Sequence, residues 1–235
     1  MFIYLICLLL SCVHPTDIRQ TAGYVLIKEI AIICKSDDPT TCEMGGITAA
    51  GSAVRIKWKG DYFWLTAAHV CSPSDSMGIK SIARNLVITE GGSGESETIL
   101  HATYNSGLDL CITPAKEGPT RVIAKNEPNL GENVSIIAYP GGAFSQTTLP
   151  IYDGRFMGHA DNTCTTTIPV AGGSSGAGVL DNNGNVIGVI SAVMRSFNHY
   201  TIIVCLEDLR SFLDQAAVQL KSASEEDVQT SETDQ

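Results

Sequence analysis

The sequence has few charged and aromatic residues, and neither type is clustered as nucleic-acid binding requires. Charged residues make up 17% and aromatic residues 6% of the 235 residues, with no basic stripe and no series of aromatic side chains. These absences exclude nucleic acid as the expected partner. The net charge is −10, but segment 222–235 supplies five negative charges and no positive one, so the rest of the chain is only mildly acidic.

Apolar runs long enough to cross a bilayer are also lacking. Residues 1–13 are almost wholly apolar, but this run is short for a transmembrane helix and has the length of a signal-peptide core. No Lys or Arg precedes it, and Leu9–Cys12 resembles a bacterial lipobox. Cys12 is therefore a candidate for lipidation and a membrane tether, with a plain signal peptide or short anchor as the alternative. We expect a secreted, periplasmic or envelope-tethered protein.

The cysteines show no C-x-x-C pair, and their spacing does not indicate a zinc site. We predict neither a metal nor an organic cofactor. Six cysteines remain after the leader, and an even number in an exported chain favours disulfide bonds. Cys34 and Cys42 bracket a short loop and are the simplest pair. A reduced protein with buried free thiols is the alternative.

Helical patterns are scarce, and short apolar runs separated by Gly, Asn, Asp and Pro predict an all-β protein. We expect two β-rich lobes, at 20–120 and 121–221. The expected strands are 23–34, 50–58, 62–67, 86–89, 97–104, 108–112, 133–139, 154–159, 165–169, 178–180, 186–193 and 201–205.

One helix is expected, from Leu206 to about Ser222, because apolar residues recur there at spacings of three and four. The segment that follows it, 222–235, is polar and acidic, and we expect it to be disordered.

A glycine-rich turn at 171–178 contains a candidate nucleophile. Serine needs a base to take its proton and backbone N–H groups to stabilise the oxyanion, and a tight turn without side chains lets those amides converge. The pattern G-x-S-G fits Gly173–Gly176 and selects Ser175. Reading Ser174 as the nucleophile would put Ser175 where the pattern needs glycine. A Gly/Ser-rich surface loop is the alternative to a catalytic turn.

Two further segments supply the partners of a nucleophilic serine. His69 follows two alanines at the end of an apolar strand, and Asp109 lies inside an otherwise apolar run. A carboxylate in that place is costly to bury without a hydrogen-bond partner. Taken singly, His69 and Asp109 have ordinary structural explanations. Together with Ser175, in the order His, Asp, Ser, they predict a catalytic triad.

The segments L-T-A-A-H, L-D-L-C-I and G-x-S-G-A, followed by V-L-D-x-x-G-x-V-I-G-V, resemble those of trypsin-like serine peptidases. The likeness covers about residues 45–214 and is nearer to bacterial Deg/HtrA-type and viral enzymes than to digestive trypsin. It implies the chymotrypsin-like fold, with two six-stranded antiparallel β-barrels, the triad between them and a C-terminal helix. We expect no PDZ domain.

The resemblance also implies the roles of individual residues. Ser175 attacks the scissile carbonyl, His69 transfers the proton, and Asp109 orients His69. The backbone N–H groups of Gly173 and Ser175 form the oxyanion hole. Protein or peptide substrates follow from this family.

This sequence departs from the family pattern at some positions, and these departures limit which family properties can be expected of it. Ser174 stands where digestive members have Asp, so we expect no activation by insertion of a new N-terminus. The walls of the substrate pocket are implied to include Val170, Ser191, Ala192 and His199 (His199 has an ordinary turn position as its alternative). No Asp lies at the pocket base, which favours an apolar P1 residue of small to medium size.

Two other function classes compete with an active endopeptidase. A catalytically inactive binding module on the same fold is disfavoured because all triad positions are intact. An α/β-hydrolase esterase would need the order Ser, Asp, His and alternating strands and helices, and both are absent.

Overall fold

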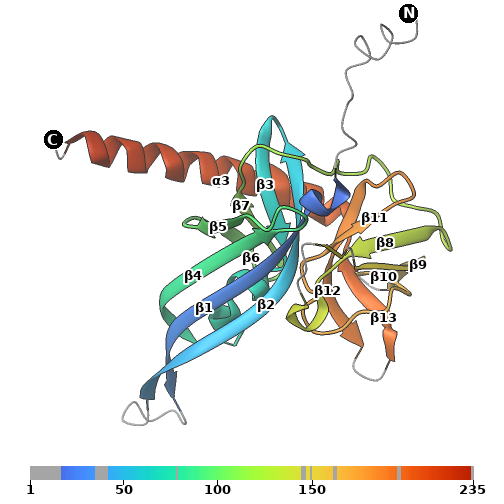
Figure 1. The fold of residues 1–235 in the computed structure, drawn as a ribbon, viewed down its shortest axis with the longest axis horizontal. Coiled ribbons are helices and arrows are strands. Elements are labelled where there is room, and N and C mark those ends of the chain that lie inside the picture. The colour runs from blue at the N-terminus through green and yellow to red at the C-terminus, as the bar shows by residue number, and fades with distance from the viewer. Residues whose placement is uncertain are drawn as a thin grey trace, which may run out of the picture.

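The computed structural model describes residues 17–34, 42–77, 79–143, 147–148, 150–160, 163–194 and 197–233. The predicted leader and Cys12 lie outside these ranges. No helix within them is both long and apolar enough to cross a bilayer. Figure 1 shows two β units side by side and one long helix that starts between them.

The first unit is an antiparallel sheet with the strand order β5-β4-β1-β2-β3-β7-β6. Its strands are β1 (Ala22–Cys34), β2 (Cys42–Trp58), β3 (Asp61–Thr66), β4 (Lys80–Glu90), β5 (Ser96–Ile99), β6 (Thr103–Asn105) and β7 (Leu110–Pro114). The strands expected at 50–58 and 62–67 are confirmed, and they form the hairpin of β2 and β3. Lys59 and Gly60 both have positive φ, of 49° and 100°, which matches the twist of a tight hairpin turn.

The first lobe differs from the expected six-stranded barrel because it has seven strands. Residues 97–104 were expected to form one strand, but the chain leaves the sheet at Leu100. β5 pairs with β4, whereas β6 pairs with β7. These two short strands therefore form opposite edges of the sheet, and the split adds one strand.

The second unit is a closed antiparallel barrel with the order β10-β13-β12-β11-β8-β9, which confirms the six-stranded barrel predicted for this lobe. Its strands are β8 (Asn133–Ile137), β9 (Ile151–Ala160), β10 (Thr163–Thr166), β11 (Gly178–Leu180), β12 (Val186–Met194) and β13 (Phe197–Val204). The turn between β11 and β12 is closed by Asp181, whose carboxylate accepts from the backbone N–H groups of Asn183 and Asn185. Closure leaves this sheet without a free edge.

Short helices connect the strands. The 3₁₀ helix η1 (Ile18–Thr21) precedes β1, the α-helical turn α1 (Ala68–Cys71) follows β3, and the 3₁₀ helix η3 (Pro140–Gly142) follows β8. A fourth, α2 (Pro73–Ser76), follows α1 where a loop was expected.

The C-terminal helix α3 (Leu206–Thr233) begins at the expected residue but continues beyond Ser222. Segment 222–233 contains neither glycine nor proline, so nothing in its composition interrupts a helix once it has started. Leu209, Leu213 and Ala216 are fully or almost fully buried, as the apolar spacing predicted. α3 contacts β6 and β7 of the first lobe and β12 of the second.

Candidate active site

His69 lies in α1, the single helical turn that directly follows β3. β3 is a buried apolar strand in the middle of the first sheet, so the position of the histidine is set by a rigid element. The imidazole is 36% exposed and thus accessible from solvent. Its Nδ1 atom lies 2.9 Å from each carboxylate oxygen of Asp109, and its backbone N–H donates to Asp109 Oδ1 at 3.0 Å.

Asp109 immediately precedes β7 and has a left-handed backbone conformation with φ of 57°. This conformation is unfavourable for a residue other than glycine and is held by the surrounding contacts. Burial alone would raise the pKa of Asp109, but hydrogen bonds from His69 and Ser191 outweigh it, so the pKa lies below its ordinary value. The carboxyl group is therefore ionised at neutral pH and accepts the Nδ1–H of His69.

Ser191 donates its hydroxyl to Asp109 Oδ2 at 2.5 Å. The pairing of β12 with β13 is irregular between Ile190 and Ala192, and such a bulge redirects the side chain at its centre. The sequence placed Ser191 in the substrate pocket but did not indicate this bond to Asp109. Only the bulge, which has no clear sequence signal, brings the hydroxyl to the carboxylate.

A disulfide between Cys71 and Cys111 joins the His69 segment to the Asp109 segment. Each cysteine lies two residues after the corresponding site residue, and both are fully buried. The sequence left this pairing open. In the structure, the bond ties α1 to β7 and restricts how far His69 and Asp109 can separate.

The turn that carries Ser175 packs against the segment that leads to His69. The carbonyl oxygen of Ser175 accepts from the Ser52 N–H at 2.8 Å. A Cβ atom on Gly176 would lie 2.0 Å from Thr66 Oγ1 and 2.9 Å from the Ala67 nitrogen. The turn can approach the β3–α1 junction this closely only because residue 176 has no side chain.

Gly51 of β2 closely approaches both α1 and the Ser175 turn. A Cβ atom there would lie 2.7 Å from Val70 and 2.9 Å from the Ser175 carbonyl oxygen. The segments that carry His69, Asp109 and Ser175 therefore lie close together. Within the described part of the chain, no hydrogen bond joins the Ser175 hydroxyl to His69.

The backbone of the glycine-rich turn has three N–H groups available to a ligand within the described residues. Ser174, Gly176 and Ala177 donate their N–H groups to backbone carbonyls of the protein. Among the residues that the structure describes, the N–H groups of Gly172, Gly173 and Ser175 have no acceptor, and those of Gly173 and Ser175 are the pair expected to form the oxyanion hole. Gly173 has a φ of 95°, which favours glycine at this position.

Ser52 is a residue of this site that the sequence reasoning missed. Its hydroxyl is completely buried, donates to the Gly173 carbonyl at 2.8 Å and accepts from the Tyr139 N–H at 2.9 Å. It thereby links β2 to the glycine-rich turn. The one sequence signal for this bridge is that Ser52 is the polar residue in a run of small residues, 49–53.

The other predicted pocket residues occupy different environments. Val170 is buried in the main hydrophobic core, whereas Ala192 and His199 are exposed on β12 and β13. Ser174 is 1% exposed, and its hydroxyl accepts from the Ala171 N–H at 3.4 Å. The chemistry available here is that of a histidine base oriented by a carboxylate, a serine on a tight turn, and backbone N–H donors of that turn without an acceptor.

Comparison with known sequences gives one family match. The sequence model of the trypsin-like peptidase domain family matches residues 51–189, which is more than half of the chain. The match includes all three residues of the predicted triad. No curated protein sequence matches this chain.

Three solved structures with a similar fold are described as proteases. The active form of the Rv3671c protease from M. tuberculosis is 19% identical with a TM-score of 0.61, over 85% of this chain and 82% of that chain. The serine endoprotease from Yersinia pestis is 16% identical with a TM-score of 0.61, over 84% of this chain and 64% of that one. The HtrA-type protease AlgW with a decapeptide is 15% identical with a TM-score of 0.60, over 84% and 65%. At these identities the likeness shows the fold, which is the chymotrypsin-like fold expected from the sequence.

Proposed function

This chain belongs to the trypsin-like peptidase family and is a serine endopeptidase, and we propose that Ser175, His69 and Asp109 are its catalytic triad. The observation that carries the proposal is the pairing of His69 Nδ1 with the ionised Asp109 carboxylate beside the Ser175 turn. With Nδ1 donating to Asp109, the lone pair of His69 is on Nε2 and can take a proton from a serine hydroxyl.

The proposed reaction is acyl transfer in two steps. Ser175 Oγ attacks the scissile carbonyl carbon while His69 Nε2 takes its proton, and His69 then gives this proton to the leaving amine. The resulting acyl-enzyme is hydrolysed by water, which His69 deprotonates in the same way, and Ser175 recovers its proton. Asp109 stabilises the imidazolium form of His69 in both steps.

The oxyanion is proposed to bind to the N–H groups of Gly173 and Ser175. Both donors lack an acceptor within the described part of the chain, and the Gly173 carbonyl is held by Ser52 on the other side. Such preorganised donors cost no rearrangement during the reaction, and each is worth about 3 to 4 kcal/mol of transition-state stabilisation.

The preference for the P1 residue of the substrate is proposed from β12, the strand that carries Ser191. Residues 190–194 contain no acidic side chain, so a P1 lysine or arginine would find no carboxylate from β12. A small or medium apolar P1 residue fits this strand, with Ala192 and His199 exposed beside it. Val170 supports the pocket from the core rather than from its surface.

Location outside the cytoplasm is supported by the disulfides Cys71–Cys111 and Cys164–Cys205, since such bonds persist in oxidising compartments. We assign the protein to the secreted, periplasmic or envelope-tethered class. Tethering through a lipidated Cys12 is the finer form of this proposal, and the mass of the mature N-terminal peptide tests it.

Labelling with a fluorophosphonate probe tests the nucleophile. The wild-type protein should react at one serine, Ser175→Ala should not react, and Ser174→Ala should retain labelling because Ser174 is buried. The reverse pattern would overturn the assignment of Ser175. A folded wild-type protein that does not react would favour the binding-module alternative.

A further inference from the structure

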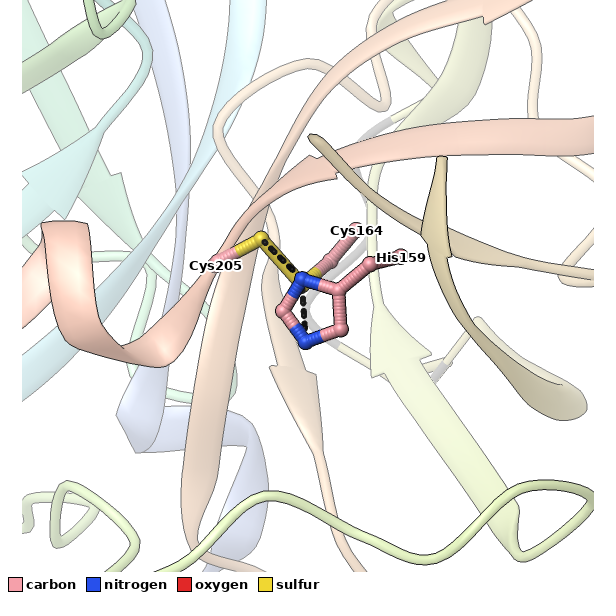
Figure 2. Close-up of side chains that lie close together, drawn as sticks. All are labelled: His159, Cys164 and Cys205. Carbon is pink, nitrogen blue, oxygen red and sulfur yellow. Dashed lines mark hydrogen bonds between the residues drawn. A yellow bond between two sulfur atoms is a disulfide. The ribbon is translucent and has the colours of Figure 1, made fainter. Parts of the chain in front are cut away.

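A second cluster of reactive side chains lies in the barrel of the second lobe, outside the proposed catalytic site. His159 is on β9, Cys164 is on β10, and Cys205 lies between β13 and α3. Their ligand atoms all lie within 4.8 Å of one another, and Figure 2 shows the imidazole against the two sulfur atoms. In this structure the two cysteines form a disulfide with a Cα–Cα distance of 5.2 Å.

The distances from the His159 nitrogen to the two sulfur atoms are close to those between ligands of one zinc ion. Zn–S bonds of about 2.3 Å and Zn–N bonds of about 2.0 Å place sulfur and nitrogen ligands about 3.5 Å apart in a tetrahedral site. His159 Nδ1 is 3.6 Å from Cys164 Sγ and 3.8 Å from Cys205 Sγ. The ring nitrogen therefore needs little movement to share a metal ion with both sulfurs, whereas the sulfurs, bonded to each other here, must move apart after reduction.

Glu127 supplies the group that would orient the histidine ligand. Its Oε2 atom lies 2.8 Å from His159 Nε2, so Nε2–H donates to the carboxylate and the lone pair is on Nδ1, which faces the sulfurs. A carboxylate–histidine–zinc arrangement of this kind holds the ring and raises its basicity. Glu127 Oε1 is also 3.6 Å from Cys164 Sγ, and this negative charge beside a thiolate favours a bound cation.

Burial gives the cluster protected sulfur ligands and an entry path. Cys164 is 1% and Cys205 is 5% exposed, whereas the side chain of His159 is 55% exposed. A metal ion can thus approach from the histidine side. Strand pairing explains why the spacing of these residues in the sequence did not reveal the cluster. His159 of β9 pairs with Cys164 of β10, and Cys164 also pairs with Ile203 of β13, two residues before Cys205.

We propose that the reduced form of this cluster binds one Zn²⁺ through Cys164, Cys205 and His159, with solvent in the fourth position and Glu127 holding the ring. A dithiol supplies two electrons and two protons to the disulfide and is itself oxidised to a disulfide. Zn²⁺ then displaces the two thiol protons to solvent and binds the thiolates. The disulfide and the zinc ion are alternative cross-links between β10 and the start of α3, so the barrel stays tied to the helix in either redox state.

Titration of the full chain with Co²⁺ under a phosphine reductant tests this site, because cobalt reports thiolate ligands by absorption. One equivalent should give a sulfur-to-metal charge-transfer band, and added Zn²⁺ should remove it because zinc binds more tightly. His159→Ala, which retains both cysteines, should lose the one-equivalent site. Glu127→Gln should weaken binding by roughly 10- to 100-fold, whereas Glu132→Gln, in the same connection between the lobes, should bind as the wild type does.

Two results would overturn the proposal. One is a reduced, folded wild-type protein that shows no charge-transfer band. The other is an equal band and affinity in His159→Ala or in Cys164→Ser/Cys205→Ser, since the remaining cysteines would then hold the metal.

Discussion

At the scale of single residues, the carboxylate of Asp109 has the largest number of roles in the proposed site. It accepts hydrogen bonds from the His69 ring, the His69 backbone and Ser191. All of these bonds favour the ionised form and lower its pKa against the opposing effect of burial. The same contacts therefore affect activity at neutral pH and stability in acid.

Asp109→Asn is expected to lower kcat by roughly 10⁴-fold, because an amide stabilises neither the required tautomer nor the imidazolium form of His69. Hydrolysis of an apolar-P1 peptide substrate at neutral pH measures this. Asp153→Asn, an exposed aspartate on β9, is the matched control and should keep wild-type activity. Equal activity in Asp109→Asn and wild type would remove Asp109 from the triad.

Asp109 also predicts a pH dependence of stability. Because folding lowers its pKa below the ordinary 3.8, its contribution to the free energy of unfolding is fully present above about pH 4 and is lost as the pH falls through the folded pKa. Urea unfolding at pH 5 and pH 3 should show a larger loss for wild type than for Asp109→Asn. An equal loss in the two proteins would contradict the lowered pKa.

At the scale of elements, the site depends on two close contacts between segments distant in the chain. One is the disulfide between α1 and β7. The other is the packing of the Ser175 turn on the β3–α1 junction, where Gly176 has a φ of 86° and no room for a side chain. Each contact holds a residue of the proposed triad against its partner.

Cys71→Ala/Cys111→Ala should lower both stability and activity. A disulfide with a sequence separation of 40 contributes about 4 kcal/mol in the chain-entropy account. Cys164→Ala/Cys205→Ala removes a disulfide of almost equal separation, 41, and is the matched control. It should lose similar stability but keep more kcat, since it lies outside the proposed triad. Urea unfolding and peptide hydrolysis below the unfolding range separate the two effects, and equal loss of kcat would contradict the role of Cys71–Cys111.

Gly176→Ala should destabilise the protein far more than Gly60→Ala. Both glycines have positive φ. A Cβ atom at residue 176 would lie 2.2 Å from the Ser52 carbonyl oxygen, whereas a Cβ atom at residue 60 would have no atom within 4 Å apart from its chain neighbours. The conformational strain alone costs about 1 to 2 kcal/mol at either position. Thermal unfolding of the two variants measures the difference, and fluorophosphonate labelling should be lost only in Gly176→Ala. Similar melting temperatures would show that the turn does not pack closely.

At the scale of the whole molecule, the two lobes share one hydrophobic core. The main cluster contains Ile56 and Ile112 of the first sheet, Ile136 and Val189 of the barrel, and Leu213 of α3. The helix reinforces this continuity because it contacts strands of both lobes. A core continuous across both lobes favours cooperative unfolding of the whole domain.

Leu213→Ala is expected to lower the free energy of unfolding by about 2 to 5 kcal/mol, the usual cost of such a cavity. Val218→Ala, at a position 66% exposed on the same helix, should change it little. Tryptophan fluorescence, from Trp58 and Trp64 in the first lobe, and circular dichroism of the whole chain should give one coincident transition for Leu213→Ala. Two separate transitions would show that the lobes unfold independently.

The sequence alone determined the β-rich architecture, the start of the final helix and the three candidate triad residues. These depend on local rules: strand periodicity, a helical apolar stripe, and a glycine turn around Ser175. His69, at the end of an apolar strand, and Asp109, inside an apolar run, were recognisable because they occur with Ser175 in the order His, Asp, Ser.

Tertiary structure alone decided what surrounds those residues. The bulge that turns Ser191 toward Asp109, the Ser52 bridge to Gly173 and the division of residues 97–104 between two sheet edges all depend on register and on contacts distant in sequence. The cluster of His159, Cys164 and Cys205 has the same origin, because neighbouring strands bring together residues that no linear spacing relates. Local patterns record which face of an element is buried, but which side chains meet across elements depends on how the whole chain packs.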